Sequence, residues 1–219
     1  MPSVLHVRPS KILGVGLNYR AHAAEMKKAL PEEPLFFLKP STALIGPGEA
    51  IVRPREWHSM EFEGELALVI GRRCRKVARE QALDVVAGWT IVNDVTVREL
   101  QKKDVQYTRA KGFDTFCPLG PVVVPTATLD PAKLRIVTRV NGQVRQDSST
   151  ADMIFDIPTI IAVASRCMTL EEGDVITTGT PSGVGPLVAG DVVAIEIQGI
   201  GVLENPVVDE APNDPEGAA

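Results

Sequence analysis

The chain has 219 residues, of which 44% are hydrophobic and 23% charged, as in an ordinary globular protein of one domain. Its formal net charge of −5 arises at the C-terminal end, because 204–219 holds five acidic residues and no basic one, while the rest holds 23 of each sign. A body without excess charge gives no reason to expect a nucleic-acid partner. No apolar run approaches the ~20 residues that span a bilayer.

The three cysteines, Cys74, Cys117 and Cys167, are widely spaced and form no CxxC pattern. This usage indicates free thiols in a reducing compartment. The first residues carry no signal-peptide core. We therefore expect a cytoplasmic protein that binds neither nucleic acid nor membrane.

The N-terminal segment predicts a short buried strand over Lys11–Leu17 and then a helix over about Tyr19–Leu30, with Asn18 as its N-cap. On this helix His22 and Glu25 are three residues apart and share a face. A carboxylate beside an imidazole orients the ring and raises its basicity, which suits a base that activates water. The alternative is an incidental pair on a surface helix.

A strand is predicted over Glu61–Gly71, and its first part carries Glu61, Glu63 and Glu65 in alternation. Alternate residues of a strand point to the same face. Like charges at this spacing repel, and burying them without partners is costly, so the pattern favours a bound cation. Carboxylate oxygens suit Mg²⁺, Mn²⁺ or Ca²⁺ better than zinc. The alternative is a solvent-facing edge whose carboxylates are hydrated.

The middle of the chain predicts a helix over Ala78–Ala87 and a β-rich run over Trp89–Val95. Asp94 ends that run, at a position that suits either a metal ligand or a helix cap. The following segment Gln106–Gly120 is polar and irregular, and it contains Lys111. We interpret it as a binding loop.

The C-terminal half predicts alternating strands and turns. An Asn-Gly turn between two β-prone runs predicts a hairpin over Leu134–Gln146. A helix is predicted over Asp156–Cys167, with proline in its first turn. Two similar units complete the pattern, Glu172–Thr177 and Ala189–Glu196. Each is predicted to be a turn followed by a strand.

A glycine-rich loop, Thr178–Gly185, joins these two units. It lacks the lysine of a phosphate-binding loop, but its threonines and free amides suit a carboxylate. The last segment, 204–219, is acidic and rich in proline and small residues, and we expect a flexible tail. Residues 1–203 then form a single domain.

Six segments, taken together and in this order, resemble the fumarylacetoacetate hydrolase family over roughly Lys11–Gly201. They are Gly14–Glu25, Phe37–Pro40, Glu63–Gly71, Asn93–Thr96, Lys111–Pro118 and Thr178–Gly185. The resemblance implies an α+β fold, a mixed β-sandwich roll with short peripheral helices, and a homodimer. It also implies that 18–34 form a mobile lid helix.

The resemblance further implies roles for individual residues. Mg²⁺ or Mn²⁺, with Ca²⁺ as a third candidate, would be held by Glu63, Glu65 and Asp94, with Glu61 only a neighbour. The implied water-activating pair is His22 and Glu25, and Lys111 matches the lysine that stabilises enolate charge. The implied substrate contacts are Arg98, Gln101 and Thr180.

The sequence shows no match to the extra N-terminal domain of full-length fumarylacetoacetase, so we expect a different substrate. We predict a metal-dependent enzyme that hydrolyses the C–C bond of an acylpyruvate to give pyruvate and a carboxylic acid. The alternatives within the family are an oxaloacetate decarboxylase and a 2-hydroxyhepta-2,4-diene-1,7-dioate isomerase. The alternative from another class is a non-catalytic β-roll that binds metal or carboxylate.

Overall fold

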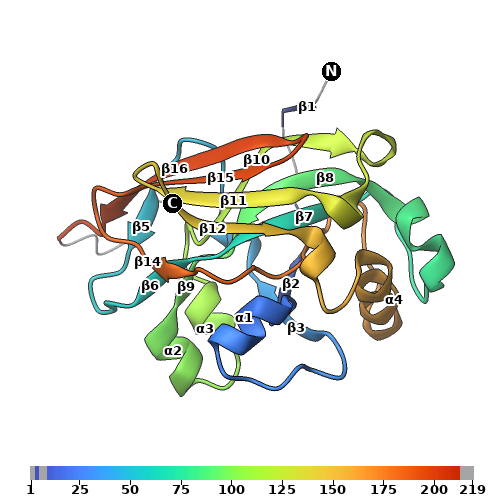
Figure 1. Ribbon diagram of the computed structural model, residues 1–219, viewed down its shortest axis with the longest axis horizontal. Coiled ribbons are helices and arrows are strands. Elements are labelled where there is room, and N and C mark those ends of the chain that lie inside the picture. Colours follow the sequence, from blue (N-terminus) through green and yellow to red (C-terminus); the bar gives the residue numbers. More distant parts are fainter. Residues whose placement is uncertain (1–2, 5–8, 213–219) are drawn as a thin grey trace.

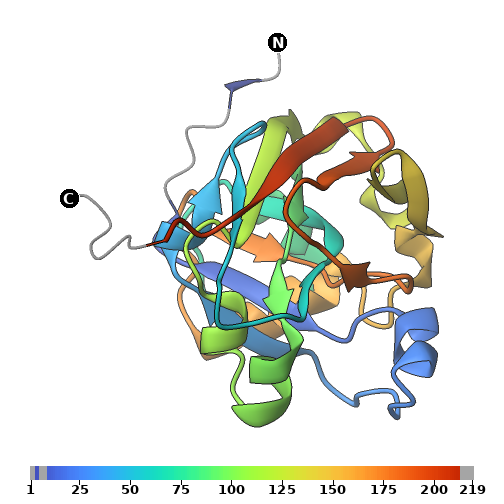
Figure 2. The same cartoon turned by 90° about the vertical axis from the view of Figure 1, so that its left-hand side faces the viewer.

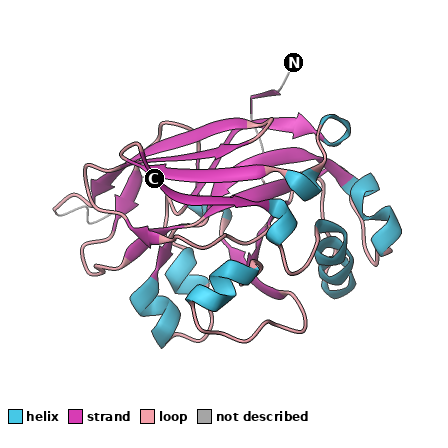
Figure 3. Cartoon of the chain, in the orientation of Figure 1, coloured by secondary structure: helices cyan, strands magenta, loops and turns pink. Residues whose placement is uncertain are grey.

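The computed structural model describes residues 3–4 and 9–212, and in this part of the chain strands are the main regular structure (Figures 1 and 3). The largest sheet has the order β1 (Ser3–Val4), β10 (Cys117–Pro125), β8 (Val86–Asn93), β7 (Gly64–Ile70), β13 (Val175–Thr177), β2 (Ile12–Gly16) and β3 (Leu35–Lys39), with β4 (Leu44–Ile45) beside β10. A five-stranded sheet has the order β12 (Gln143–Ser149), β11 (Arg135–Val140), β15 (Val192–Ile197), β16 (Gly201–Asp209) and β5 (Ile51–Arg53). A small third sheet joins β14 (Gly185–Pro186), β6 (Met60–Phe62) and β9 (Thr96–Val97).

The two larger sheets pack against each other, with β11 and β15 of the five-stranded sheet touching β7 and β8 of the largest sheet. All seven residues of β7 are buried, so this strand is covered on both faces. A strand covered in this way reads as a continuous apolar run, which is the pattern after Glu65. The predicted α+β fold is confirmed: mixed sheets with few short helices.

The helices are short and lie outside the sheets. They are α1 (Arg20–Glu25), α2 (Arg98–Lys103), α3 (Thr108–Lys111) and α4 (Ile157–Cys167), with 3-10 turns at Ser41–Ala43, Arg79–Val85, Thr126–Thr128, Pro131–Lys133 and Thr150–Asp152. Helices α2 and α3 pack together. Helix α1 lies with them below β11 and β12 in Figure 1 but on the opposite side of the molecule from them in Figure 2, and α4 lies to the right of all three in Figure 1. Among the described residues no helix is long and apolar enough to cross a membrane.

The predicted helix Tyr19–Leu30 is wrong in its length, because α1 ends at Glu25. Lys27 adopts a left-handed backbone with φ of 53°. The amides of Lys27 and Lys28 then donate back to the carbonyls of Ala24 and Ala23 at 3.0 Å each, which closes the helix as a Schellman turn. The first residues of the predicted lid are thus one short helix, and 26–34 follow it without regular structure.

Asn18 is also not the N-cap that the sequence predicts, since Tyr19 occupies that position without a side-chain cap. The buried Asn18 side chain instead joins two distant segments. Its Nδ2 donates to the carbonyl of Thr178 at 2.8 Å, and its Oδ1 accepts from the amide of Phe155 at 2.8 Å. Asn18 therefore holds the start of α1 against the glycine-rich loop.

The predicted helix Ala78–Ala87 is wrong. Its first part is the 3-10 turn Arg79–Val85, and β8 begins at Val86. Gly88, directly after the predicted helix, lies inside β8. Only glycine fits there, because a side chain would overlap the backbone carbonyl of Val124 on the neighbouring strand. The close approach of β10 explains this glycine better than a helix end does.

The predicted flexible tail 204–219 is wrong over its first residues, because β16 continues to Asp209. In β16, Leu203 and Val207 are buried, and Val207 pairs with Ile51 of β5. Residues 213–219 lie outside the described part. The predicted loop Gln106–Gly120 is likewise only partly irregular, because it contains α3 and the start of β10.

The remaining elements agree with the sequence-based predictions. The hairpin forms from β11 and β12 around Asn141 and Gly142. Helix α4 begins beside Asp156, whose Oδ1 accepts from the amide of Thr159 at 2.9 Å. The two turn-and-strand units become β13 and β15.

Candidate functional site

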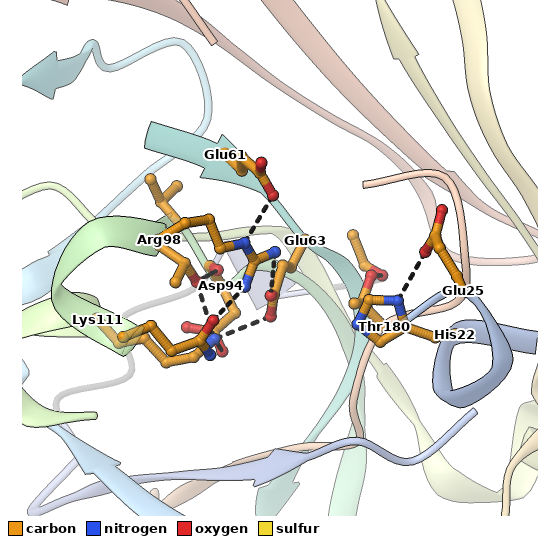
Figure 4. Close-up of polar contacts among 12 residues, drawn as sticks. His22, Glu25, Glu61, Glu63, Asp94, Arg98, Lys111 and Thr180 are labelled. Atoms are coloured by element: carbon orange, nitrogen blue, oxygen red, sulfur yellow. Dashed lines mark hydrogen bonds and ion pairs between the residues drawn. The ribbon is translucent and has the colours of Figure 1, made fainter. Parts of the chain in front are cut away.

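Three buried carboxylates meet where the largest sheet and the small sheet join. One carboxylate oxygen from each of Glu63, Glu65 and Asp94 lies within 4.8 Å of the others (Figure 4). Glu65 projects from β7, Asp94 follows β8 beside it, and Glu63 stands between β6 and β7. The backbone amide of Asp94 donates to the carbonyl of Glu63 at 2.9 Å, which joins the segment before β7 to the segment after β8.

The predicted single strand from Glu61 is interrupted at Glu63. The strand changes sheets there, because β6 pairs with β9 and β14 while β7 joins the largest sheet. The amide of Glu63 donates to Asn93 Oδ1 at 3.0 Å instead of to a neighbouring strand's backbone. The break leaves Glu63 and Glu65 in one cluster and turns Glu61 aside toward Arg98.

Two buried lysines enter the carboxylate cluster. Lys111 Nζ donates to Glu63 Oε2 at 2.8 Å and to Asp94 Oδ2 at 2.5 Å. Lys39 Nζ donates to the other Asp94 oxygen, Oδ1, at 2.5 Å. The relative exposures of Lys111 and Lys39 are 2% and 1%, so neither ammonium is hydrated by solvent and both depend on the carboxylates for compensation.

Arg98 adds a third cation from the first turn of α2. Its guanidinium pairs with Glu61 Oε2 and with Glu63 Oε1, each at 2.6 Å. Its Nη1 also donates to Gln101 Oε1 at 2.9 Å. Figure 4 shows Arg98 and Lys111 approaching the carboxylates from one side and His22 from the other.

The electrostatics of the cluster separate its two glutamates. Burial alone raises the pKa of Glu63, but Lys111 and Arg98 outweigh it and lower that pKa to about 2. Burial, together with the charges of Asp94 and Glu63, raises the pKa of Glu65 well above its usual value. Because a ligating carboxylate must be ionised, a bound cation would lower the pKa of Glu65 again.

The donor set fits a divalent cation. Three carboxylates offer hard oxygen ligands, and these suit Mg²⁺, Mn²⁺ or Ca²⁺. The raised pKa of Glu65 arises first from burial and then from the charges of Asp94 and Glu63, and a divalent cation among the three carboxylates would offset this repulsion. The residues present are thus consistent with a metal site.

His22 and Glu25 form the pair that the sequence predicts. His22 Nδ1 lies 2.9 Å from Glu25 Oε2, and the side chains are 8% and 38% exposed. Glu25 also accepts from the backbone amide of Gly183 at 3.1 Å, so the end of α1 contacts the glycine-rich loop. The imidazole of His22 is therefore the buried member of the pair, and Glu25 is the more exposed one.

A small cavity connects these groups. Its lining includes His22, Glu63, Glu65, Arg98, Gln101, Tyr107, Lys111 and Thr180. The cavity measures about 40 Å³, room for only a few water molecules. Seven of the nine predicted site residues thus line this cavity. Of the other two, Asp94 belongs to the carboxylate cluster and Glu25 contacts His22.

The hydroxyl of Thr180 has a fixed direction. Its Oγ1 donates its only proton to the carbonyl of Gly64 at 2.9 Å and accepts from Gln146 Nε2 at 2.8 Å. Thr180 therefore offers the cavity an acceptor and not a donor. This polarity is a feature of the site that the sequence does not reveal.

Sequence reasoning missed Lys39 and Gln146. Lys39 is the last residue of β3 and the only fully buried one, and its sequence neighbours give no sign of that burial. Gln146 lies in the predicted hairpin, two residues after the exposed Val144, so strict alternation would place both side chains on the outer face. The pairing of β11 and β12 shifts register between Thr138 and Arg139, and this irregularity turns Gln146 inward. No local pattern in the sequence marks this irregularity.

The chain resembles known proteins over most of its length. The model of the fumarylacetoacetate (FAA) hydrolase C-terminal family matches residues 11–208. The chain is 45% identical over 212 residues to the oxaloacetate tautomerase YisK of Bacillus subtilis, which covers 92% of this chain and 70% of that protein.

Two solved structures show the same architecture. The 2-hydroxyhepta-2,4-diene-1,7-dioate isomerase from Mycobacterium marinum has a TM-score of 0.87 at 48% identity, with 94% of this chain and 77% of that chain covered. The maleylpyruvate hydrolase from Sphingobium sp. SYK-6, solved with manganese(II) and pyruvate, has a TM-score of 0.83 at 40% identity, with 94% and 72% covered. The related proteins thus carry the names of three different reactions.

Proposed function

The chain belongs to the fumarylacetoacetate hydrolase family, and we propose that it is a divalent-metal-dependent enzyme that hydrolyses the C–C bond of an acylpyruvate-type 2,4-dioxo acid. The products are pyruvate and a carboxylic acid. One observation carries the proposal: a carboxylate cluster with a buried lysine faces a histidine–glutamate pair across a single small cavity. A site that only binds metal or carboxylate has no need of such a pair.

Glu63, Glu65 and Asp94 are the residues that would hold the cation, with Mg²⁺ or Mn²⁺ as first candidates and Ca²⁺ as a third. The manganese(II) in the related maleylpyruvate hydrolase supports this assignment. When bound, the cation supplies a Lewis acid for the 2-oxo carboxylate end of the substrate. Arg98, Gln101 and Thr180 line the same cavity and are proposed as substrate contacts.

His22 is the proposed general base. It takes a proton from water, while Glu25 at Nδ1 holds the ring and stabilises the imidazolium. The water oxygen adds to the distal carbonyl carbon, and the C–C bond on its pyruvate side breaks. The electron pair of that bond passes into the enolate of pyruvate, whose charge Lys111 stabilises. The enolate then takes the proton that His22 removed from water, which gives pyruvate and returns His22 to its neutral form.

Substrate entry requires α1 to move. A 2,4-dioxo acid is larger than a cavity of about 40 Å³ accommodates. Helix α1 carries His22 and Glu25, and at its end the exposed contact of Glu25 with Gly183 holds it to the glycine-rich loop. Movement of α1 and its return would admit the substrate and then exclude bulk water.

A second candidate is decarboxylation or tautomerisation of a 2-oxo diacid such as oxaloacetate. The name of the relative YisK favours it, and the lysine and carboxylates that stabilise an enolate serve this chemistry equally well. That reaction needs no attacking water. We also propose, from family membership, that the protein is a cytoplasmic homodimer.

The test is a coupled pyruvate-release assay with added Mg²⁺ over a panel of acylpyruvates and oxaloacetate. We expect acetylpyruvate or a longer acylpyruvate to be the best substrate. Glu25→Ala should lower its hydrolysis by about 10²–10⁴-fold, the usual worth of general acid–base assistance, and lower oxaloacetate turnover much less.

The matched control is Glu32→Ala, an exposed glutamate of the same 18–34 segment, which should leave both activities unchanged. Equal losses of both activities in Glu25→Ala would contradict the role of His22 and Glu25 in activating water. Absence of turnover of every acylpyruvate would contradict the hydrolase itself.

A further inference from the structure

Gln146 lies fully buried behind the site, in the five-stranded sheet. It belongs to β12, and its side chain has 0% exposure, whereas Val144 in the same strand is 54% exposed. Three hydrogen bonds use its amide. The amide of Gly64 donates to its Oε1 at 3.1 Å, and its Nε2 donates to Thr180 Oγ1 and to the carbonyl of Pro181 at 2.8 Å each.

Two backbone groups determine which way this amide points. A backbone N–H such as that of Gly64 can only donate, and a carbonyl such as that of Pro181 can only accept. Oε1 therefore faces Gly64 and Nε2 faces Pro181, which leaves the second Nε2 proton for Thr180. The hydroxyl of Thr180 consequently accepts from Gln146 and directs its own proton to the carbonyl of Gly64.

Gly64 is thus held on both sides of its backbone, through its N–H by Gln146 and through its C=O by Thr180. It is also the residue between Glu63 and Glu65. A side chain at this position would overlap Thr138 Oγ1, so the five-stranded sheet packs directly on the backbone here. Any shift of Gly64 moves both carboxylates.

We propose that Gln146 is a positioning residue of the site, which fixes Gly64 and thereby sets the spacing of the Glu63 and Glu65 carboxylates for a divalent cation. It touches none of the reacting groups. It acts from a different sheet, through one peptide unit and one hydroxyl. The inference rests on the proposed function, because it assumes that the carboxylate cluster binds a metal.

Gln146→Met tests the proposal, because methionine has a similar length and shape but makes none of the three hydrogen bonds. The probe is Mn²⁺ alone, and the readouts are its dissociation constant and its electron paramagnetic resonance spectrum in the metal-loaded protein. We expect the dissociation constant to rise about 10–100-fold, the usual effect of losing a group that orients metal ligands, and the spectrum to change. Gln143→Met, at the exposed start of the same strand, is the control and should alter neither readout.

A double-mutant cycle with Thr180→Val sharpens the test. Both substitutions release the same peptide unit, so their effects on Mn²⁺ affinity should be clearly less than additive. Independent, additive effects would overturn the proposal. If Gln146→Met fails to fold, Thr180→Val carries the test, because it frees the carbonyl of Gly64 and leaves Gln146 in place.

The remaining outcomes separate this inference from the proposed function. If Gln146→Met has a lower unfolding temperature but unchanged Mn²⁺ affinity and spectrum, Gln146 only joins two sheets and the inference is overturned. It is also overturned if neither variant folds. If the unsubstituted protein binds no Mn²⁺, the proposed metal site fails and this inference fails with it.

Discussion

Replacing Lys39 by methionine tests how the buried carboxylate cluster is neutralised. Lys39 Nζ lies 2.5 Å from Asp94 Oδ1, and the two side chains are 0% and 1% exposed. Lys111 holds the other oxygen of Asp94 at the same distance. Methionine preserves most of the volume of Lys39 and removes its charge, so Lys39→Met leaves Asp94 with one cation instead of two.

The expected cost is large in the metal-free protein. At an effective dielectric constant of ~20, two unit charges 2.5 Å apart attract by roughly 7 kcal/mol before desolvation is counted. Removing one partner of a buried pair costs about 3–5 kcal/mol net, and the remaining contact with Lys111 places Asp94 near the lower end. At about 2–4 °C per kcal/mol for a chain of this size, the unfolding temperature should fall by roughly 6–12 °C.

Saturating Mg²⁺ should reverse much of this loss. A cation held by Glu63, Glu65 and Asp94 replaces the positive charge that Lys39 supplied, and a ligand that binds only the folded state stabilises it. The increase in unfolding temperature on adding Mg²⁺ should therefore be larger for Lys39→Met than for the unsubstituted protein.

The assay is thermal unfolding followed by calorimetry, in EDTA and in excess Mg²⁺. Lys133→Met, which removes an exposed lysine, is the control and should unfold as the unsubstituted protein does. An equal fall of Lys39→Met in both conditions would refute the reasoning, because Lys39 would then stabilise the fold independently of the cluster. An unchanged unfolding temperature in EDTA would also refute it.

Three further predictions use other parts of the structure. Glu63→Gln, Glu65→Gln and Asp94→Asn should each abolish Mg²⁺ dependence and most turnover, and a variant that keeps full Mg²⁺-dependent activity would identify a residue that is not a ligand. Hydrogen exchange of 18–34 should slow when oxalate binds, because an isolated helix this short is marginal in water, and equal exchange with and without oxalate would contradict a mobile lid. Burial raises the pKa of Asp174, but its hydrogen bonds with Lys11 and Ser10 outweigh burial and hold the pKa below its usual 3.8. The ionised Asp174 therefore stabilises the folded state above pH 3.8, and this stabilisation is lost as the pH falls through the lower pKa of the folded state. The gap in urea midpoint between Asp174→Asn and the unsubstituted protein should accordingly narrow below pH 3.8, and a gap that is constant from neutral to acid pH would exclude this contribution.

Local patterns predicted the parts of the site that lie close together in the sequence. Alternation placed Glu63 and Glu65 on one side of a strand, and helical spacing paired His22 with Glu25. Alternation failed for Glu61, because the strand changes sheets at Glu63 and no local pattern marks that break. Asp94 could be assigned to the cluster only through the resemblance to a family.

The residues that sequence reasoning missed have distant partners. Lys39 meets Asp94 across 55 positions, and Gln146 meets Gly64 across 82. Such contacts depend on which strands become neighbours, and a single sequence does not specify this. The predicted helix Ala78–Ala87 fails at its end for a similar reason, because β8 begins at Val86 and lies beside the distant strand β10, which approaches Gly88 closely.

The contacts of Glu25 explain why a test of the base needs two reactions. One Glu25 oxygen orients His22, while the carboxylate also accepts from the amide of Gly183, which has a left-handed φ of 95° and lies against the backbone of Arg145. Because the same side chain contacts the proposed base and holds α1 to the glycine-rich loop, the proposed assembly of the base would accompany closure of the site. Loss of Glu25 therefore removes both, and hydrolysis alone cannot separate them. Oxaloacetate decarboxylation depends on a closed site but not on an activated water, so only the difference between the two losses measures the base itself.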